Sequence, residues 1–153
     1  MPLAKFRGQG TCAGFEDNIV SGGAPIKNWQ LSGEEAMPTY RNLGGERVLH
    51  YRTRKTACPG CPIACKGKVR NDQGPFRVGE MEKPEYESLT ALGPMCLNDN
   101  LEGVMKAIDL CNRYGLDTIS TGTTIAFAME CFDRGIIDEK DTGGLALTWG
   151  SVD

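Results

Sequence analysis

Residues 99–115 read DNLEGVMKAIDLCNRYG, and this stretch decides the fold class. Its apolar side chains recur at the three- and four-residue spacing that is typical of one helical face. They are Leu101, Val104, Met105, Ile108 and Cys111. An Asn or Asp residue suits the position before this helix, and Gly115 suits the position after it. We therefore predict an amphipathic helix between residues 100 and 115.

A second helix is predicted for STGTTIAFAMECFDRG, residues 120–135. Serine or threonine residues suit its amino-terminal cap, and Gly135 suits its end. The side chains expected to face inward are Ile125, Ala128, Met129 and Phe132. A shorter helix is expected from Pro84, with Glu85 and Glu87 in its first turn, where carboxylates favour the helix dipole.

The first half of the chain is poorer in periodic apolar positions. Residues 1–57 are expected to form a loop-rich wrapping segment, in which Ser32 to Glu35 form a capping box and Pro38 ends a short helix. In residues 66–80 the turn NDQG predicts a short β-hairpin, with Phe76 and Val78 on its half-buried face. The predicted fold is mainly α: a cysteine-rich loop and helical domain, residues 58–153, preceded by the loop-rich segment.

Composition narrows the class of protein. The chain has 153 residues and a net charge of −3, which gives no bulk attraction to nucleic acid. No apolar run approaches the roughly 20 residues of a membrane span, and no signal peptide is recognisable. We therefore expect a cytoplasmic protein with neither nucleic-acid nor membrane partners. Both ends look unlike natural termini, so we expect a piece of a longer chain.

Seven cysteines are present, and three of them cluster in TACPGCPIACKG, residues 56–67. Cys58, Cys61 and Cys65 have the spacing C-x2-C-x3-C, which lets a short loop curl around an iron–sulfur cubane. In a reducing compartment such thiols indicate metal or redox chemistry. A zinc site and inert cysteines are the alternatives. A fourth ligand is needed, and it is one of the remaining cysteines or lies beyond residue 153. The remaining cysteines are Cys12, Cys96, Cys111 and Cys131.

Several segments in this order resemble the tungsten-containing aldehyde ferredoxin oxidoreductase family. They are GTCAGFEDNIVSGGAPIKNW (10–29), CPGCPIAC (58–65), EKPEYESLTALGPMC (82–96) and LCNRYGLDTISTGTTIAFAMECFDRGII (110–137). The resemblance covers roughly residues 8 to 150. It implies a 4Fe–4S cluster held by Cys58, Cys61, Cys65 and a distant downstream cysteine that this chain lacks.

The resemblance also implies a tungsten bis-pterin cofactor held by two D-x-x-G-L-(D/C) motifs. NRYGLD matches the first motif, so Asn112, Gly115, Leu116 and Asp117 would contact the pterin. Asn112 stands where the motif usually has aspartate, so the charge-assisted, two-point hydrogen bonding of a carboxylate is lost. Glu87 would be the proton-transfer group near the metal. As a residue alone, it equally fits an ordinary first-turn glutamate.

The function implied is oxidation of an aldehyde to a carboxylic acid, with ferredoxin or another one-electron carrier as acceptor. Basic residues around the cysteine loop could steer an acidic ferredoxin, offset the cluster charge or form a solvated face. They are Arg52, Arg54, Lys55, Lys66, Lys68 and Arg70. Three alternatives remain: a fragment of a tungsten-dependent benzoyl-CoA reductase acting on an aromatic acyl-CoA, a non-catalytic cluster-binding fragment, and a zinc-binding structural domain. A homo-oligomer or larger complex is compatible with each.

Overall fold

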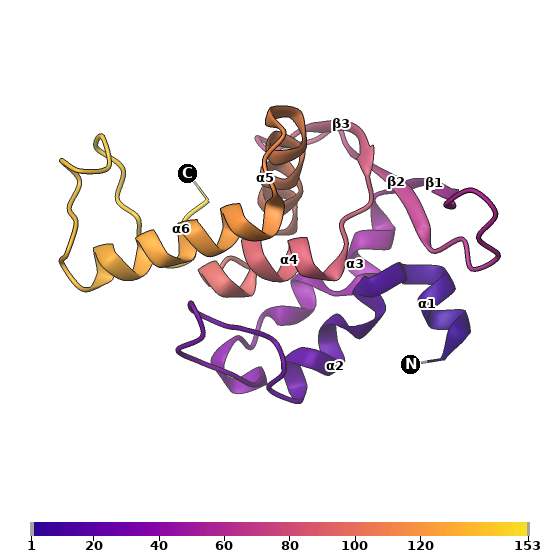
Figure 1. Ribbon diagram of the computed structural model, residues 1–153, viewed down its shortest axis with the longest axis horizontal. Helices are drawn as coiled ribbons and strands as arrows, with labels where there is room; N and C mark the ends of the chain where they lie inside the picture. Colours follow the sequence, from indigo (N-terminus) through magenta and orange to yellow (C-terminus); the bar gives the residue numbers. More distant parts are fainter. Residues whose placement is uncertain (1, 153) are drawn as a thin grey trace.

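The computed structural model describes residues 2–152 (Figure 1). Helices dominate it, and a single three-stranded antiparallel sheet accompanies them, which confirms the predicted fold class. The helices are α1 (Leu3–Gln9), α2 (Phe15–Val20), α3 (Gly45–His50), α4 (Tyr86–Leu92), α5 (Leu101–Tyr114) and α6 (Thr118–Asp133). The 3₁₀ turns are η1 (Gly10–Gly14), η2 (Glu34–Ala36), η3 (Tyr40–Leu43) and η4 (Pro94–Cys96). The strands are β1 (Arg52–Thr56), β2 (Lys66–Asn71) and β3 (Val78–Glu82).

Helix α5 forms as its sequence predicts. The side chain of Asn100 accepts a hydrogen bond from the Gly103 amide at 2.9 Å, which satisfies one of the unpaired amides of the first turn. Gly115 ends the helix at φ 69°, a left-handed conformation that glycine adopts at little cost. All five residues of the predicted apolar face are buried.

Helix α6 is rotated relative to the prediction. Its inward face consists of Gly122, Ala126 and Met129, so the expectation is confirmed for Met129 and wrong for Ile125, which is 36% exposed. The reason is the close approach of α6 to α4, which only a small residue permits. The cap also differs from the prediction, because Asp117 rather than a serine or threonine precedes the helix and accepts from the Ser120 amide at 2.6 Å.

The amino-terminal 57 residues contain more regular structure than the sequence predicts. The expected helix after Ser32 is only the turn η2, which follows Gly33 without a side-chain cap. Side chains from this segment share one apolar core with α4 and α5; its members include Phe15, Ile19, Ile26, Tyr40, Leu43, Val48, Leu89, Leu101, Val104 and Met105. The segment therefore wraps the helices from below in Figure 1 and completes their core. A domain boundary after residue 57 stays a prediction.

The sheet has the order β1-β2-β3. The predicted hairpin around residues 71–74 is confirmed, with Val78 buried and Phe76 two residues ahead of β3. Strand β1 was not expected, and it pairs with β2 so that Thr56 lies opposite Lys66. The cysteine loop, which we define as residues 57–65, is thus the connection of a second hairpin.

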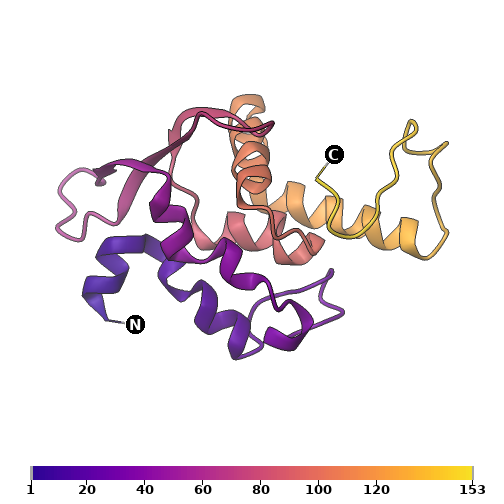
Figure 2. The ribbon, with the colours of Figure 1, turned by 180° about the vertical axis from the view of Figure 1, so that it is seen from behind.

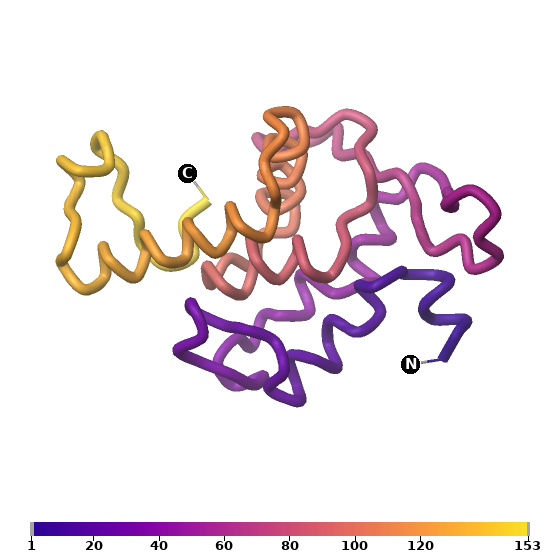
Figure 3. The backbone as a smooth tube through the Cα atoms, viewed as in Figure 1, coloured from indigo at the N-terminus to yellow at the C-terminus, as the bar shows by residue number. Residues whose placement is uncertain are grey.

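The cysteine loop and α6 lie at opposite ends of the molecule. The loop projects from β1 and β2 above α1, on the right of Figure 1 and on the left of the view from behind in Figure 2. The backbone trace in Figure 3 shows residues 134–152 returning alongside α6 at the other end. Helix α4 and the segment that precedes it lie between these two ends.

Candidate cluster loop and cofactor corner

The three clustered cysteines all lie on the cysteine loop. Cys58 is exposed, Cys61 and Cys65 are half-buried, and all three are free thiols. The loop curls where the Cys61 amide donates to the Cys58 carbonyl at 3.0 Å and where Gly60 and Ala64 take the positive φ values of 71° and 53°. A positive φ is uncommon for alanine, so the turn before Cys65 is a constrained one.

The donor chemistry of this loop fits an iron–sulfur cluster. Three accessible thiols on one short curled segment are the ligand type and spacing that such clusters use. Their sulfurs do not converge on a single point: within residues 2–152, no group of three or more His, Cys, Asp or Glu side chains is arranged to hold a metal ion. The assignment of Cys58, Cys61 and Cys65 as ligands therefore stays a prediction.

The other four cysteines behave as small apolar residues of the interior. Burial raises the pKa of Cys12 and of Cys96 to about 12, so both remain protonated thiols rather than thiolates. The Cys12 thiol donates to the carbonyl oxygen of Pro84 at 3.1 Å. Cys111 is buried on α5, and Cys131 is half-buried on α6.

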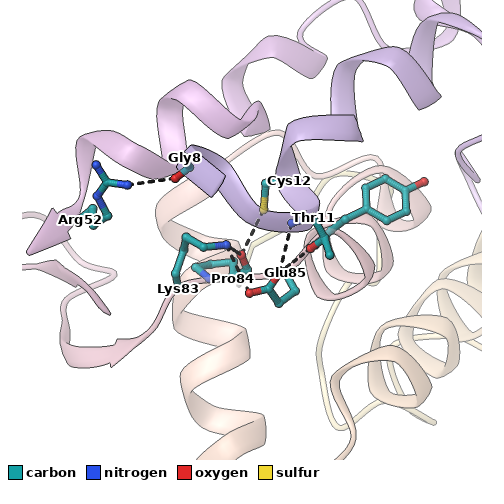
Figure 4. A network of polar contacts seen from close by, with 8 residues as sticks. Gly8, Thr11, Cys12, Arg52, Lys83, Pro84 and Glu85 are labelled. Atoms are coloured by element: carbon teal, nitrogen blue, oxygen red, sulfur yellow. Dashed lines mark hydrogen bonds and ion pairs between the residues drawn. The ribbon is translucent and has the colours of Figure 1, made fainter. Parts of the chain in front are cut away.

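A buried lysine follows the last strand of the sheet. The side chain of Lys83 is 1% exposed, and its ammonium donates to the Pro84 carbonyl at 3.0 Å and pairs with Glu85 Oε1 at 3.3 Å (Figure 4). Its backbone amide donates to the Gly67 carbonyl at 2.8 Å, two residues after Cys65. Main chain and side chain together therefore place this ammonium at the base of the cysteine loop.

Gly10 allows the ammonium and the loop to approach each other. A Cβ on Gly10 would lie 2.8 Å from Lys83 Nζ and 3.1 Å from the carbonyl oxygen of Cys65. Both atoms thus face one point that only a glycine leaves open. The Arg52 guanidinium donates to the Gly8 carbonyl at 3.0 Å and ties β1 to α1 (Figure 4).

Thr11 connects this network to the start of α4. Its hydroxyl donates to Glu85 Oε2 and accepts from the Tyr86 amide at 2.8 Å. Helix α4 consequently begins at Tyr86 with Glu85 as its cap, and the prediction of Pro84 as the first helical residue is wrong. The physical reason is that a hydroxyl from η1 satisfies the amide of the first helical residue.

Glu87, the predicted proton-transfer group, is an exposed residue in the first turn of α4. Its negative charge raises the pKa of Cys12, although less than burial and the neighbouring Glu85 do. The half-buried carboxylate of the network is that of Glu85. The position of Glu87 is compatible with a first-turn glutamate that favours the helix dipole, and its catalytic role stays a prediction.

The residues of the motif NRYGLD form the corner between α5 and α6. Gly115 is the left-handed residue, and the Leu116 amide donates back to the Cys111 carbonyl at 2.8 Å, which closes the end of α5. Asn112 is exposed on the last turn of α5, and Leu116 is 54% exposed. Hydrogen bonds from the Ser120 amide and hydroxyl hold the pKa of Asp117 below its ordinary value.

A pocket of about 410 Å³ joins this corner to the network of Lys83. Lys83, Glu85 and Ser88 line one side, and Asn112 and Thr118 line the other. The hydroxyls of Ser88 and Thr118 lie 2.7 Å apart and connect α4 to α6 across it. The structure therefore brings Asn112 near the start of α4, while it leaves Leu116 and Asp117 on the outer side of the corner.

Several basic residues beside the cysteine loop have acidic partners. Arg54 pairs with Glu80 at 2.8 Å, and Arg70 pairs with Asp72 at 2.6 Å. Exposed ion pairs of this kind contribute little to stability but reduce the local positive charge. Steering of an acidic carrier by this surface stays a prediction.

Comparison with known proteins decides the family. All of residues 1–153 match the family described as aldehyde ferredoxin oxidoreductase, domains 2 & 3. The chain belongs to the aldehyde ferredoxin oxidoreductase family. It is 37% identical over 140 residues to the tungsten-containing aldehyde ferredoxin oxidoreductase of Pyrococcus furiosus, covering 89% of this chain and 22% of that protein. The resemblance inferred from the cysteine, PEYE and NRYGLD segments is thereby confirmed.

Two further proteins are similar to this chain. The tungsten-containing aldehyde ferredoxin oxidoreductase of Thermococcus kodakarensis is 34% identical over 139 residues, 89% of this chain and 22% of that protein. An aliphatic sulfonate oxidoreductase, WOR-like subunit, of Pyrococcus furiosus is 30% identical over 154 residues, 97% of this chain and 23% of that protein. The chain spans about a fifth of the length of these relatives.

Sequence reasoning missed Lys83, Thr11, Ser88 and Thr118 in this member of the family. A lysine between a strand and a helix gives no sign of burial in a single sequence, and hydroxyl residues are common at helix ends.

In the part of the chain that the structure describes, every helix is too short or too polar to cross a bilayer.

Proposed function

We propose that this chain is part of a tungsten-dependent oxidoreductase that oxidises aldehydes to carboxylic acids with ferredoxin as acceptor. The proposal rests on membership of the family across the whole chain and on the names of the two aldehyde ferredoxin oxidoreductases described above. A tungsten bis-pterin would supply the two-electron chemistry, and a 4Fe–4S cluster would supply one-electron transfer. The seven free thiols suit the reducing cytoplasm that we propose as its location.

The structural observation that supports the proposal is the connection between the cysteine loop and the NRYGLD corner. Lys83 is tied by its backbone to Gly67 after the loop, and it lines the same pocket as Asn112. An electron relay requires its donor and acceptor sites to be held at a fixed distance. Short strands, the half-buried ion pair of Lys83 and Glu85, and α4 form a continuous connection of that kind.

In this proposal each predicted residue has one role. Cys58, Cys61 and Cys65 supply three of the four thiolates, and the fourth comes from a part of the protein outside this chain. Asn112 accepts a hydrogen bond through its amide oxygen, at the position where the family motif has aspartate. Glu87 exchanges a proton with the reacting group.

The names of the relatives point to more than one substrate class. The aldehyde assignment follows the names of two relatives, whereas a third relative is named as an aliphatic sulfonate oxidoreductase subunit. An aromatic acyl-CoA, as in the benzoyl-CoA reductase alternative, stays a hypothesis from sequence. Anaerobic assays of the full-length protein with each substrate class, and with ferredoxin or a dye as electron carrier, would separate the three.

The deciding experiment is elemental analysis of the native protein, purified without oxygen. About four iron atoms and one tungsten atom per chain are expected for one cubane and one mononuclear centre. Iron without tungsten would support the non-catalytic cluster-binding alternative. Zinc alone, in a colourless protein, would support a zinc-binding structural domain and overturn the proposal.

A further inference from the structure

Two of the three cysteines on the cysteine loop are brought together by a tight turn. The sequence from Cys58 to Cys61 is CPGC, and the Cys61 amide donates to the Cys58 carbonyl at 3.0 Å. Pro59 and Gly60 occupy the two central positions of this turn, and Gly60 has φ 71°. Proline followed by a residue with a positive φ is typical of a type II β-turn. The chain therefore reverses its direction between the two cysteines.

This turn gives the two cysteines the backbone separation of a disulfide. The first and last Cα atoms of a β-turn lie within about 7 Å of each other, and bridged cysteines have Cα atoms about 4.4–6.8 Å apart. The turn also has room to adjust, since nothing lies within 4 Å of the point where a Cβ on Gly60 would stand. A disulfide between Cys58 and Cys61 therefore requires only a local adjustment of the turn.

Cys65 lies outside this turn, at the base of the loop. It precedes Lys66, the first residue of β2, and its carbonyl oxygen lies 3.1 Å from the Cβ position of Gly10. Ala64, with φ 53°, redirects the chain just before it. Within residues 2–152 no three side chains are arranged to hold a metal ion. The loop thus has the geometry of a paired dithiol with a third, separate thiol.

We propose that Cys58 and Cys61 form a redox-active dithiol, which small-molecule disulfides oxidise reversibly to an intramolecular disulfide in the metal-free protein. This inference goes beyond the proposed function and does not require a cluster. The thiolate is the form of cysteine that ligates a metal, so a sulfur held in a disulfide is not available as a ligand. The bond therefore closes the loop to metal until a thiol reduces it.

The exposure of the two thiols sets the order of the reaction. Cys58 is exposed and Cys61 is half-buried, and both are free thiols. In thiol–disulfide exchange a thiolate attacks an accessible disulfide. The Cys58 sulfur attacks the small-molecule disulfide, releases one of its thiols and retains the other as a mixed disulfide. The Cys61 sulfur then attacks the Cys58 sulfur and releases the second thiol. The small molecule gains two electrons and two protons, and the pair of cysteines loses them.

The test uses the full-length protein, purified metal-free from iron-limited cells and checked for its fold by circular dichroism. It is equilibrated with mixtures of reduced and oxidised glutathione, and the remaining free thiols are alkylated. Trypsin releases residues 56–66 as one peptide, because Lys55 and Lys66 are its cleavage sites. Fragmentation of this peptide in a mass spectrometer shows which cysteines carry the alkyl label. Oxidised wild type should carry it on Cys65 alone.

Two serine variants test whether the turn selects the pair. Cys65→Ser is the matched control, because it removes a thiol of the same loop and leaves the turn intact. Its equilibrium constant for disulfide formation should stay within about twofold of the wild-type value. Cys58→Ser leaves Cys61 and Cys65, which the turn does not bring together, so its equilibrium constant should be at least about tenfold lower.

Each outcome supports or overturns the inference. A label on Cys65 alone, with the disulfide retained in Cys65→Ser and weakened in Cys58→Ser, supports it. Labels on all three cysteines at every glutathione ratio would overturn it, as would glutathione that stays bound to Cys58 without ring closure. Equal equilibrium constants in the two variants, or a metal-free protein without its native fold, would also overturn it. A native protein without iron would overturn the proposed function alone.

Discussion

Thr11 and Glu85 are 74 positions apart in the sequence, and the hydroxyl of the first donates to the carboxylate of the second. The same hydroxyl accepts from the amide of Tyr86, the first residue of α4. One side chain from the amino-terminal segment therefore fixes where α4 begins. It also sets the orientation of the carboxylate that pairs with Lys83.

Replacing Thr11 by valine should destabilise the protein by about 1–3 kcal/mol. The change preserves shape but leaves the Tyr86 amide without its partner and Glu85 Oε2 with only the longer bond from the backbone amide of residue 11, at 3.4 Å. Denaturant unfolding gives the free energy of unfolding. Thr123→Val is the control, because that hydroxyl bonds only to carbonyls of its own helix, and a change within about 0.5 kcal/mol is expected. If the free energy of unfolding fell equally in Thr11→Val and Thr123→Val, a special role for Thr11 would be contradicted.

Gly122→Ala should cost about 1–3 kcal/mol through overpacking. A Cβ at Gly122 would lie 2.5 Å from the carbonyl oxygen of Ala91 on α4, so the two helices would have to separate. Gly8→Ala on α1 is the matched control, because nothing lies within 4 Å of its Cβ position. Alanine favours helix over glycine, so this control should stabilise by about 0.5–1 kcal/mol. Thermal unfolding of both variants should give shifts of opposite sign.

The fold class and α5 could be predicted because they depend on local patterns. Helix α5 is predicted by its cap residues, Asn100 and Gly115, and by the apolar positions between them, without any tertiary information. The structure confirms this helix. The turn between β2 and β3 is predictable for the same reason. In α6 the helix itself was predicted correctly, but Gly122 rather than Ile125 meets α4, because a close approach between backbones overrides the preference for large apolar residues.

The candidate site was predictable only where residue types have few other uses. The spacing of Cys58, Cys61 and Cys65 pointed to one loop, and the structure places all three there. Burial of Lys83 was not predictable, since it depends on Gly10, which is distant in the sequence. Short charged segments carry no record of such long-range contacts.

The contribution of Asp117 to stability should disappear in acid. Hydrogen bonds from Ser120 lower the pKa of Asp117 in the folded state, so its contribution is fully present above the ordinary pKa of aspartate. It is lost as the pH falls through the lowered pKa, below about pH 4. Asp117→Asn keeps a capping oxygen but does not titrate there. The free energy of unfolding is measured for both proteins at a series of pH values. The excess for wild type over this variant should shrink as the pH falls. A constant difference across this pH range would contradict the prediction.

Cys61→Ser should remove the cluster, because Cys61 is the central thiol of the loop. Iron content should fall from about four atoms per chain to near zero, together with the broad absorption near ~400 nm that thiolate-bound iron gives. Cys131→Ser is the control, since this half-buried thiol lies on α6 and should retain full iron. Full iron and normal reduction of ferredoxin in Cys61→Ser would show that the loop does not hold a cluster.

Asn112→Ala should reduce tungsten without reducing iron. The exposed side chain contributes little to folding, so the loss of one hydrogen bond to the pterin, up to about tenfold in affinity, should appear in tungsten content alone. Asn112→Asp should retain tungsten at least as well as wild type, because a carboxylate adds a charge-assisted second contact. Tyr114→Ala, at a 77% exposed position of the same corner, is the control. Metal analysis after dialysis checks all three, and equal tungsten in Asn112→Ala and wild type would remove Asn112 from the cofactor site.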